Sequence, residues 1–418
     1  MKVLIYSHSC KNCDGVSVRY KEHIKNLQKN DHDIFFITGK KELDDNISCQ
    51  NTYLTNQYRI PNTLIHYPLF SINNLKIIIN TIHEFKPDVI HVTTDLSTLT
   101  WLLASKITNV PIIVCYHADS GVFMDKYNMN FFKKIVHKFE RKIAEYSDNA
   151  FTVSESYRKK TLNIYGDILN NITWGPMINK NIFNNLSLKE DEYTILREKY
   201  ILGRDKLIIY AGRISSEKGL DYCIDFIKST SITNLCFLII GRGPENFVKK
   251  IQKYHNQTFS NQNTINYLPY FLSQEELSKM YKISDIYFTG SEFETLGFGA
   301  IEAISCDCFA LCPDSQGFQD TIKHEINGYL YQPNHYNDTE KGLKLLLDKD
   351  SNNISETCKE MNIDKCTENV LKLYDETIQN HKKQNNCCEI FQIFILNTIM
   401  TFTITIGYYS GLLYLSEY

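Results

Sequence analysis

The residues with the clearest chemical potential are two glutamates, Glu294 and Glu302, in the stretch SDIYFTGSEFETLGFGAIEAISCDCFAL (284–311). A short apolar run, Ile286–Phe288, predicts a buried strand, and Leu296–Ser305 carries apolar residues at helical spacing. In a strand–loop–helix unit, the unpaired amide groups of the first helical turn lie at the carboxyl edge of a parallel sheet and form an anion site. Carboxylates beside such a site can accept hydrogen bonds from sugar hydroxyls. The stretch therefore predicts a nucleotide-sugar site.

A second candidate is the loop AGRISSEKG, which contains Arg213 and Lys218 and follows the predicted strand Lys206–Tyr210. Two cations on one loop can neutralise a diphosphate. By itself, such a loop is more typical of a solvated basic turn. Because Glu294 and Glu302 lie in the same half of the chain, we favour a ligand-binding loop over a solvated turn. We expect both cations to contact a diphosphate.

Two further candidates lie in the first half of the chain. His117 directly follows the apolar run IIVCY, at the predicted carboxyl end of a strand, where ligands bind in open α/β sheets. That position leaves a structural and a catalytic role open. Gly15 lies where a loop meets a helix and could let a phosphate or sugar approach the backbone, although its spacing alone favours a simple turn residue. The loop lacks G-x-G-x-x-G, so it carries no dinucleotide fingerprint.

The elements that must position these residues form two α/β halves. The first half opens with a predicted strand (Val3–Tyr6), a helix (Val16–Lys29) and a second strand (Asp33–Thr38), which is the start of a doubly wound sheet. Residues 171–200 are rich in Asn, with Gly and Pro, and predict an interdomain linker. We therefore expect domains at 1–180 and 181–362, a C-terminal helix and juxtamembrane segment at 363–386, and a membrane anchor at 387–418.

Composition excludes several classes of protein. The 418 residues are enough for two domains with full cores, and 43% apolar with 22% charged residues is ordinary for a globular protein. A net charge of −3 argues against a general nucleic-acid binder. The 13 cysteines are scattered, which favours reduced thiols in the cytosol. Cys10 and Cys13 have CxxC spacing, but no second ligand pair accompanies them, so we expect no zinc site.

The C-terminal residues have a different composition. No charged residue occurs from Ile390 to Leu415, a length that spans about 39 Å as a helix, whereas a hydrocarbon core is about 30 Å thick. Lysines just before this run predict a tail anchor with the catalytic body on the cytosolic side of a membrane. Cys387 and Cys388 at its start could be palmitoylated. The alternative is a buried C-terminal helix, because Thr, Asn and Gly dilute the apolar run.

The ordered set of motifs resembles the retaining GT-B glycosyltransferases of family 4, over about residues 1–375. The resemblance is carried by ETLGFGAIEA (the family's E-x7-E segment), YAGRISSEKGLD (its diphosphate loop), IIGRGP, and FKPDVIHV followed by VPIIVCYHAD. The segments DGVSVRYKEHIKNL and FTVSESYRKKTL are most similar to the branch of sulfoquinovosyl and GDP-mannose-dependent mannosyl transferases. The resemblance implies two Rossmann-like, doubly wound domains that face a cleft.

The resemblance also implies a role for each candidate in the second half. Arg213 and Lys218 would hold the donor diphosphate, with Gly212 among the donor-binding residues. Glu294 would contact the transferred sugar, and Glu302 would bind the ribose hydroxyls.

Three further roles follow from the same resemblance. The backbone amides near Leu296 and Gly297 would meet the phosphate, His117 would lie at the reacting sugar, and Gly15 would lie near the diphosphate on the facing domain. His117, Glu294, Arg213 and Lys218 form the implied catalytic set. The family needs no metal or other cofactor, because cationic side chains and a helix N-terminus stabilise the leaving diphosphate. The only carboxylate pair of interest, Asp44–Asp45, is isolated in a predicted loop.

The sequence departs from the family pattern at two turns. After the second glutamate it reads EAISCDCFAL, with Asp307 where the family usually has Gly and Phe309 where it has Pro. The residues MIN (177–179) replace the family's GVD. Neither change removes an implied catalytic group, so we expect an active enzyme.

The function expected from the sequence is transfer of a sugar, with retention, from a UDP- or GDP-sugar to a lipid, glycan or other membrane-associated acceptor. Two alternatives remain: a sugar-nucleotide 2-epimerase, which needs no acceptor, and an inactive membrane-anchored sugar-binding protein. The donor alone yields an epimer in the first case, and binds without turnover in the second.

Overall fold

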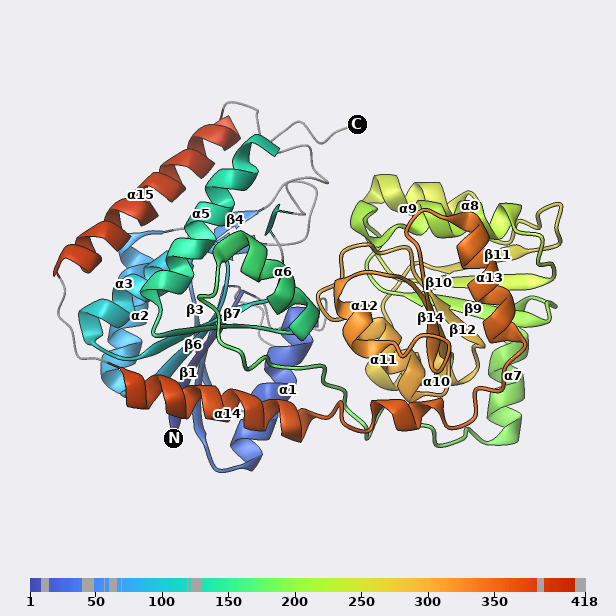
Figure 1. Ribbon diagram of the computed structural model, residues 1–418, viewed down its shortest axis with the longest axis horizontal. Coiled ribbons are helices and arrows are strands. Elements are labelled where there is room, and N and C mark those ends of the chain that lie inside the picture. The colour runs from blue at the N-terminus through green and yellow to red at the C-terminus, as the bar shows by residue number, and fades with distance from the viewer. Residues whose placement is uncertain are drawn as a thin grey trace. The chain divides into compact units, whose positions relative to one another are not determined.

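The computed structural model describes residues 1–8, 15–39, 49–55, 57–59, 66–68, 70–118, 120–121, 130–381 and 387–409. The chain forms two compact units (Figure 1). Unit 1 contains Met1–Gly175 together with Ile363–Tyr418, and unit 2 contains Pro176–Asn362. The last two described helices therefore belong to the same unit as the N-terminus.

Unit 1 is built on a six-stranded parallel sheet with the order β3-β2-β1-β6-β7-β8. Its strands are β1 (Lys2–Ser7), β2 (Asp33–Thr38), β3 (Gln50–Tyr53), β6 (Val89–Thr93), β7 (Ile112–Tyr116) and β8 (Asn149–Thr152). The accompanying helices are α1 (Gly15–Lys29), α2 (Ile72–Phe85), α3 (Thr98–Thr108), α5 (Asn130–Tyr146), α6 (Glu155–Tyr165), α14 (Ile363–Asn380) and α15 (Cys387–Tyr409). A small antiparallel pair, β4 (Gln57–Arg59) and β5 (His66–Pro68), completes the described elements.

Unit 2 repeats this plan with a second six-stranded parallel sheet, in the order β11-β10-β9-β12-β13-β14. Its strands are β9 (Lys206–Ala211), β10 (Leu235–Ile240), β11 (Thr264–Leu268), β12 (Ile286–Phe288), β13 (Phe309–Pro313) and β14 (Gly328–Tyr331). Its α-helices are α7 (Glu190–Ile201), α8 (Leu220–Ser229), α9 (Glu245–Gln252), α10 (Gln274–Lys282), α11 (Phe298–Ser305), α12 (Gln316–Thr321) and α13 (Tyr336–Leu347). Two short 3-10 turns, Ser216–Lys218 and Ile354–Cys358, lie in its connections.

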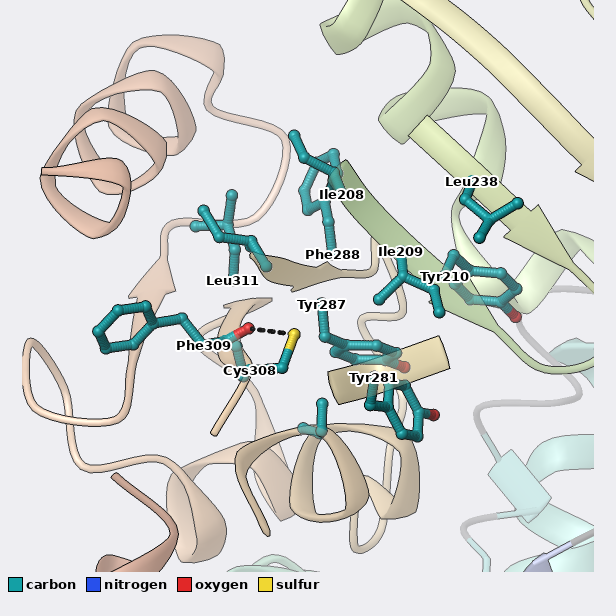
Figure 2. Packing of buried hydrophobic residues seen from close by; sticks show 14 of the residues in the cluster. Ile208, Ile209, Tyr210, Leu238, Tyr281, Tyr287, Phe288, Cys308, Phe309 and Leu311 are labelled. Atoms are coloured by element: carbon teal, nitrogen blue, oxygen red, sulfur yellow. Dashed lines mark hydrogen bonds between the residues drawn. The ribbon is translucent and has the colours of Figure 1, made fainter. Parts of the chain in front are cut away.

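Burial on both faces explains why the strands are continuous apolar runs rather than alternating ones. Every residue of β7 and β10 is buried. Figure 2 shows this in unit 2, where the side chains of Tyr287 and Phe288 extend from β12 to opposite sides of the sheet. Tyr287 packs edge-on against Tyr281 of α10, with 6.2 Å between the ring centroids. The prediction of two doubly wound sheets is confirmed.

The two departures from the family pattern after α11 are accommodated by backbone conformation. Asp307 has φ of +58°, the left-handed region that glycine adopts most easily and that Asp tolerates better than other side chains. Its Oδ1 accepts a hydrogen bond of 2.9 Å from the Ser355 amide. Phe309 begins β13 and is buried. The chain thus turns at Asp307 in a left-handed conformation, and the same side chain anchors the loop at Ser355.

The structure does not support the predicted membrane-spanning helix. Over the part of the chain that is described, no helix combines the length and apolar character needed to cross a membrane. Helix α15 instead packs along α3. Its Asn397 is buried and donates a 3.1 Å hydrogen bond to Thr100, and its Glu389 lies 3.6 Å from the Lys106 ammonium. A run without charges does not show which polar side chains have partners within the fold.

The turn at Asp307 gives the first testable expectation. Replacing Asp307 with Val should lower the free energy of unfolding by about 2 kcal/mol, because a β-branched residue is strained at positive φ and the Ser355 amide loses its acceptor. Urea unfolding followed by circular dichroism measures the change. The control Asp307→Asn keeps both the tolerated conformation and an acceptor oxygen. Equal losses in the two variants would contradict this explanation of the turn.

Candidate active site

The candidate residues of unit 2 lie where the strand order reverses. Strand β9 pairs with β10 on one side and with β12 on the other, and the chain proceeds outward in both directions from that central pair. The loops after β9 and β12 therefore leave the sheet side by side at its carboxyl edge. Ligands of open α/β sheets bind at such a switch point. Arg213 and Lys218 follow β9, and Glu294 follows β12.

The structure brings two of the predicted residues into direct contact. The Lys218 ammonium forms an ion pair with Oε1 of Glu294, across the boundary between the two loops. The same carboxylate oxygen accepts a 3.2 Å hydrogen bond from the Ser291 hydroxyl. Both charged side chains remain partly exposed, at 19% and 22%. A cation and a carboxylate are thus held together at the sheet edge while still reached by solvent.

A third carboxylate, which sequence reasoning did not assign, orders the cationic loop. Glu217 is buried, and its Oε1 lies 3.5 Å from the Arg213 guanidinium. The Ser215 hydroxyl donates a 2.6 Å hydrogen bond to the same oxygen. The Arg213 carbonyl in turn accepts a 2.7 Å hydrogen bond from Tyr210. The sequence signal for the role of Glu217 was its position between Arg213 and Lys218 in RISSEKG.

Two glycines allow the loops to touch. Gly219 has φ of +61°, and a Cβ placed on it would overlap the backbone carbonyl of Gly290 in the loop after β12. A Cβ on Gly290 would overlap the Gly219 carbonyl in the same way. Each loop therefore needs a residue without a side chain where the other passes. This contact sets the distance between the two loops, which the Lys218–Glu294 ion pair spans.

The predicted anion-binding helix is α11, and its start is tightly fixed. Gly297 precedes the helix with φ of +75° and packs so closely on the Phe318 ring that a Cβ would lie 2.7 Å from it. The Leu296 side chain is buried in the core of unit 2. The Gly317 amide donates a 2.8 Å hydrogen bond to the Glu294 carbonyl. These contacts hold the loop from Glu294 to Gly297 and the amide groups of the first helical turn in one arrangement.

Glu302 lies about one turn into α11, where its environment favours the neutral acid. Its Oε2 accepts a 3.3 Å hydrogen bond from the Tyr281 hydroxyl. Burial raises the pKa of Glu302 to about 8, from an ordinary value of 4.5, and the Tyr281 bond offsets only part of that rise. No basic side chain contributes to the shift. A ligand that donates hydrogen bonds to Glu302 would stabilise the ionised carboxylate and lower its pKa.

In unit 1, the structure places His117 directly after β7, where the sequence predicted it. The side chain is 8% exposed, and its ring packs against Tyr20 of α1 and Trp174 at centroid distances of 5.4 and 5.6 Å. Gly15 is the first residue of α1 and is exposed. Cys10, Cys13, Asp44 and Asp45 lie outside the described residues.

A buried polar network beneath His117 was not predicted. The Tyr374 hydroxyl of α14 lies 2.7 Å from Nδ1 of His91 and 3.1 Å from Nε2 of His23, and Nε2 of His91 lies 3.2 Å from the Tyr20 hydroxyl. Burial lowers the pKa of His23 to about 3 and that of His91 well below its ordinary value, so both rings are neutral. The network fastens α14 to α1 and β6 and supports the aromatic wall beside His117.

The fold and the site define a class before any comparison is made. Two Rossmann-like units, each built on a six-stranded parallel sheet, are the architecture of the GT-B fold. Two family models match the chain and together cover most of it. Residues 13–173 match Glycosyltransferase Family 4, and residues 192–364 match Glycosyl transferases group 1. The chain is a glycosyltransferase of group 1 with a family 4 N-terminal domain.

Relatives among curated sequences agree with this assignment. An uncharacterised glycosyltransferase of Methanocaldococcus jannaschii is 23% identical over 340 residues, which cover 76% of this chain and 81% of that protein. The sulfoquinovosyl transferase of Arabidopsis thaliana is 25% identical over 65% of this chain, and the match spans only 52% of that longer protein. The alpha-monoglucosyldiacylglycerol synthase of Acholeplasma laidlawii is 22% identical over 61% of this chain and 66% of its own length.

Solved structures share the fold. A glycosyltransferase from Rickettsia africae superposes with a TM-score of 0.70 at 19% identity, covering 91% of this chain and 99% of that one. The sucrose-phosphate synthase of Thermosynechococcus elongatus gives 0.73 at 16% identity, covering 90% and 98% of the two chains. The Anabaena protein HepE, in complex with UDP and glucose, gives 0.72 at 14% identity, covering 90% and 99%. At these identities the likeness shows the GT-B fold.

The contact between the two loops can be tested with a matched pair of glycines. Gly219 and Gly203 both have positive φ, at +61° and +70°, but a Cβ on Gly203 would meet nothing within 4 Å. Alanine at either position should cost about 1 kcal/mol of stability through backbone strain. Only Gly219→Ala should also separate the loops and weaken UDP or GDP binding by at least about tenfold. Isothermal titration calorimetry measures the affinity, and equal affinities in the two variants would rule out the spacing role.

The raised pKa of Glu302 predicts a pH dependence of stability. Between about pH 4.5 and 8 the folded protein keeps this proton and the unfolded chain does not, so the free energy of unfolding should fall as pH rises through that window. Glu302→Gln mimics the neutral acid and should become progressively more stable than wild type from pH 5 to pH 8.5. Urea titrations at several pH values test this. Glu198→Gln, an exposed glutamate on α7, is the control, and a parallel profile for Glu302→Gln would contradict the assignment.

Proposed function

We propose that this glycosyltransferase moves a sugar, with retention of anomeric configuration, from a nucleoside diphosphate sugar to a lipid or other membrane-associated acceptor. The observation that carries the proposal is the Lys218–Glu294 ion pair at the switch point of unit 2, with Arg213 on the same loop. This arrangement provides two cations for a diphosphate and a carboxylate for sugar hydroxyls. Relatives named as a sulfoquinovosyl transferase and as an alpha-monoglucosyldiacylglycerol synthase support the reaction class.

In the proposed mechanism, Arg213 and Lys218 stabilise the negative charge that develops on the leaving diphosphate. The acceptor hydroxyl attacks the anomeric carbon from the face that the diphosphate leaves, and a diphosphate oxygen takes up the hydroxyl proton. The bond from the anomeric carbon to the acceptor oxygen forms as the bond to the diphosphate oxygen breaks. Charge stabilisation by the two cations and by the amide groups at the start of α11 would make a metal ion unnecessary.

Binding contacts follow from the same geometry. In the structure Lys218 is paired with Glu294. A bound diphosphate would attract Lys218 away from Glu294, and the Glu294 carboxylate would then be available to sugar hydroxyls. Glu302 would accept hydrogen bonds from ribose hydroxyls in its ionised form, so donor binding near neutral pH should release a proton. His117 is assigned to the transferred sugar on the family resemblance, supported by its place after β7.

The reaction is tested with a panel of UDP- and GDP-sugars incubated with a membrane lipid extract and analysed by mass spectrometry. The proposal expects one donor to yield a glycosylated lipid with retained anomeric configuration, which NMR of the product establishes. Formation of an epimer from the donor alone would instead indicate a 2-epimerase. Donor binding without turnover would indicate an inactive binding protein.

The role of the cations is tested by substitution. Lys218→Ala and Arg213→Ala should each lower kcat by about 100-fold or more, because the developing charge on the leaving diphosphate loses a preorganised partner. The control Lys249→Ala removes an exposed lysine that also pairs with a glutamate, Glu245, and should leave kcat unchanged. A near wild-type kcat in either site variant would remove that residue from the mechanism.

A further inference from the structure

Helix α15 presents two unlike faces. Its buried face, which includes Ile393, Asn397 and Met400, packs toward the body of unit 1, where α15 contacts α3. Four large apolar side chains on the opposite face point to solvent at spacings of three and four residues. They are Phe391, Phe394, Ile395 and Ile399, which are 64%, 45%, 38% and 49% exposed. A helix that is apolar on both sides normally has both sides covered. Phe394 meets Phe70 edge-on, with 5.8 Å between the ring centroids, but all four side chains keep more than a third of their surface exposed.

A basic helix lies beside this apolar face. Helices α5 and α15 run next to each other on unit 1 (Figure 1), and the Tyr146 hydroxyl at the end of α5 donates a 2.8 Å hydrogen bond to Gln392 of α15. Helix α5 carries five cations, Lys133, Lys134, Lys138, Arg141 and Lys142, against two glutamates. Lys134 and Lys138 are exposed and one turn apart. An apolar stripe therefore lies beside a row of positive charge.

The carboxylates of these two helices offset only part of that charge. Glu140 is buried, Glu145 is already paired with Arg141 and Lys142, and Glu389 lies against Lys106. A second copy of the chain on the same face would place lysines against lysines, because a twofold contact pairs a surface with itself. A lipid surface with anionic headgroups complements both parts, since its phosphates attract the lysines and its acyl boundary accepts the phenylalanines.

We propose that the outer face of α15, together with Lys134 and Lys138 of α5, is a docking surface for an anionic lipid bilayer, on which α15 lies parallel to the membrane plane. This is peripheral binding through one side of a helix, a different mode from crossing the bilayer. The proposal rests on the exposed face and the adjacent charge, and it is independent of the transfer reaction. A failure to bind lipid vesicles would leave the proposed sugar transfer untouched, and a failure of sugar transfer would leave the docking surface untouched.

The first test is cosedimentation of the full chain with vesicles. Binding should be strong with equimolar phosphatidylcholine and phosphatidylglycerol, weak with phosphatidylcholine alone, and reduced by salt. Phe391→Ser with Ile399→Ser should weaken binding to the mixed vesicles by more than about tenfold. The matched control, Ile195→Ser with Ile326→Ser, removes two equally exposed apolar side chains of unit 2 and should have no effect. Equal binding by the two double variants would overturn the proposal.

The charged part of the surface is tested separately. Lys134→Gln with Lys138→Gln should weaken binding to the mixed vesicles by about fivefold for each lysine. Lys249→Gln with Lys253→Gln, an exposed pair at the same spacing at the end of α9, is the control. Thermal unfolding of every variant should match wild type, because all the replaced side chains are exposed.

A spectroscopic readout distinguishes insertion from other contacts. The chain has two tryptophans, Trp101 and Trp174, and both are fully buried. In a Phe394→Trp variant, the added fluorescence should shift to the blue with mixed vesicles and be quenched by brominated lipids. An unchanged spectrum with vesicles would overturn the proposal. So would a concentration-dependent dimer of the wild-type chain that Phe391→Ser with Ile399→Ser dissociates, in the absence of vesicle binding.

Discussion

The geometry of the candidate site depends on the contact between the loops that follow β9 and β12. Gly219 and Gly290 bring the two backbones together, and the Lys218–Glu294 ion pair spans them. A partly exposed ion pair contributes at most about 1 kcal/mol to stability. The pair therefore explains little of why the domain folds. It explains how a cation and a carboxylate stay together at the switch point, next to the start of α11, which is where the proposed diphosphate-sugar donor would contact both.

Much of the fold could be predicted from the sequence, because the parallel strands are buried on both faces and appear as apolar runs such as IIVCY. The site could be predicted only in part. Local pattern does not specify strand order, so nothing in the residues alone shows that Lys218 meets Glu294, 76 positions later. The Tyr374 contact with His91 joins residues 283 positions apart and leaves no local signal. The family resemblance implied a donor-binding role for both Lys218 and Glu294, but it did not predict their ion pair.

The C-terminal helix shows the opposite case, in which a strong local signal did not specify the surroundings of the helix. A long run without charges predicted a membrane span, but the helix is shared between two environments. Asn397 and Glu389 face partners on α3, while the phenylalanines face outward. The proposed lipid acceptor and the proposed docking of α15 would both bring the enzyme to a bilayer without a membrane-spanning helix. The apolar character of α15 could be predicted from the sequence. The structure shows which face of the helix is exposed.

The measurement that tests the central claim most directly is a crystal structure of the chain with an intact UDP- or GDP-sugar bound. The account predicts diphosphate oxygens within about 2.9 Å of the Arg213 guanidinium and the Lys218 ammonium, with the sugar hydroxyls at Glu294 and the ribose hydroxyls at Glu302. A donor whose diphosphate lies away from the loops after β9 and β12, with the Lys218–Glu294 pair undisturbed, would contradict it.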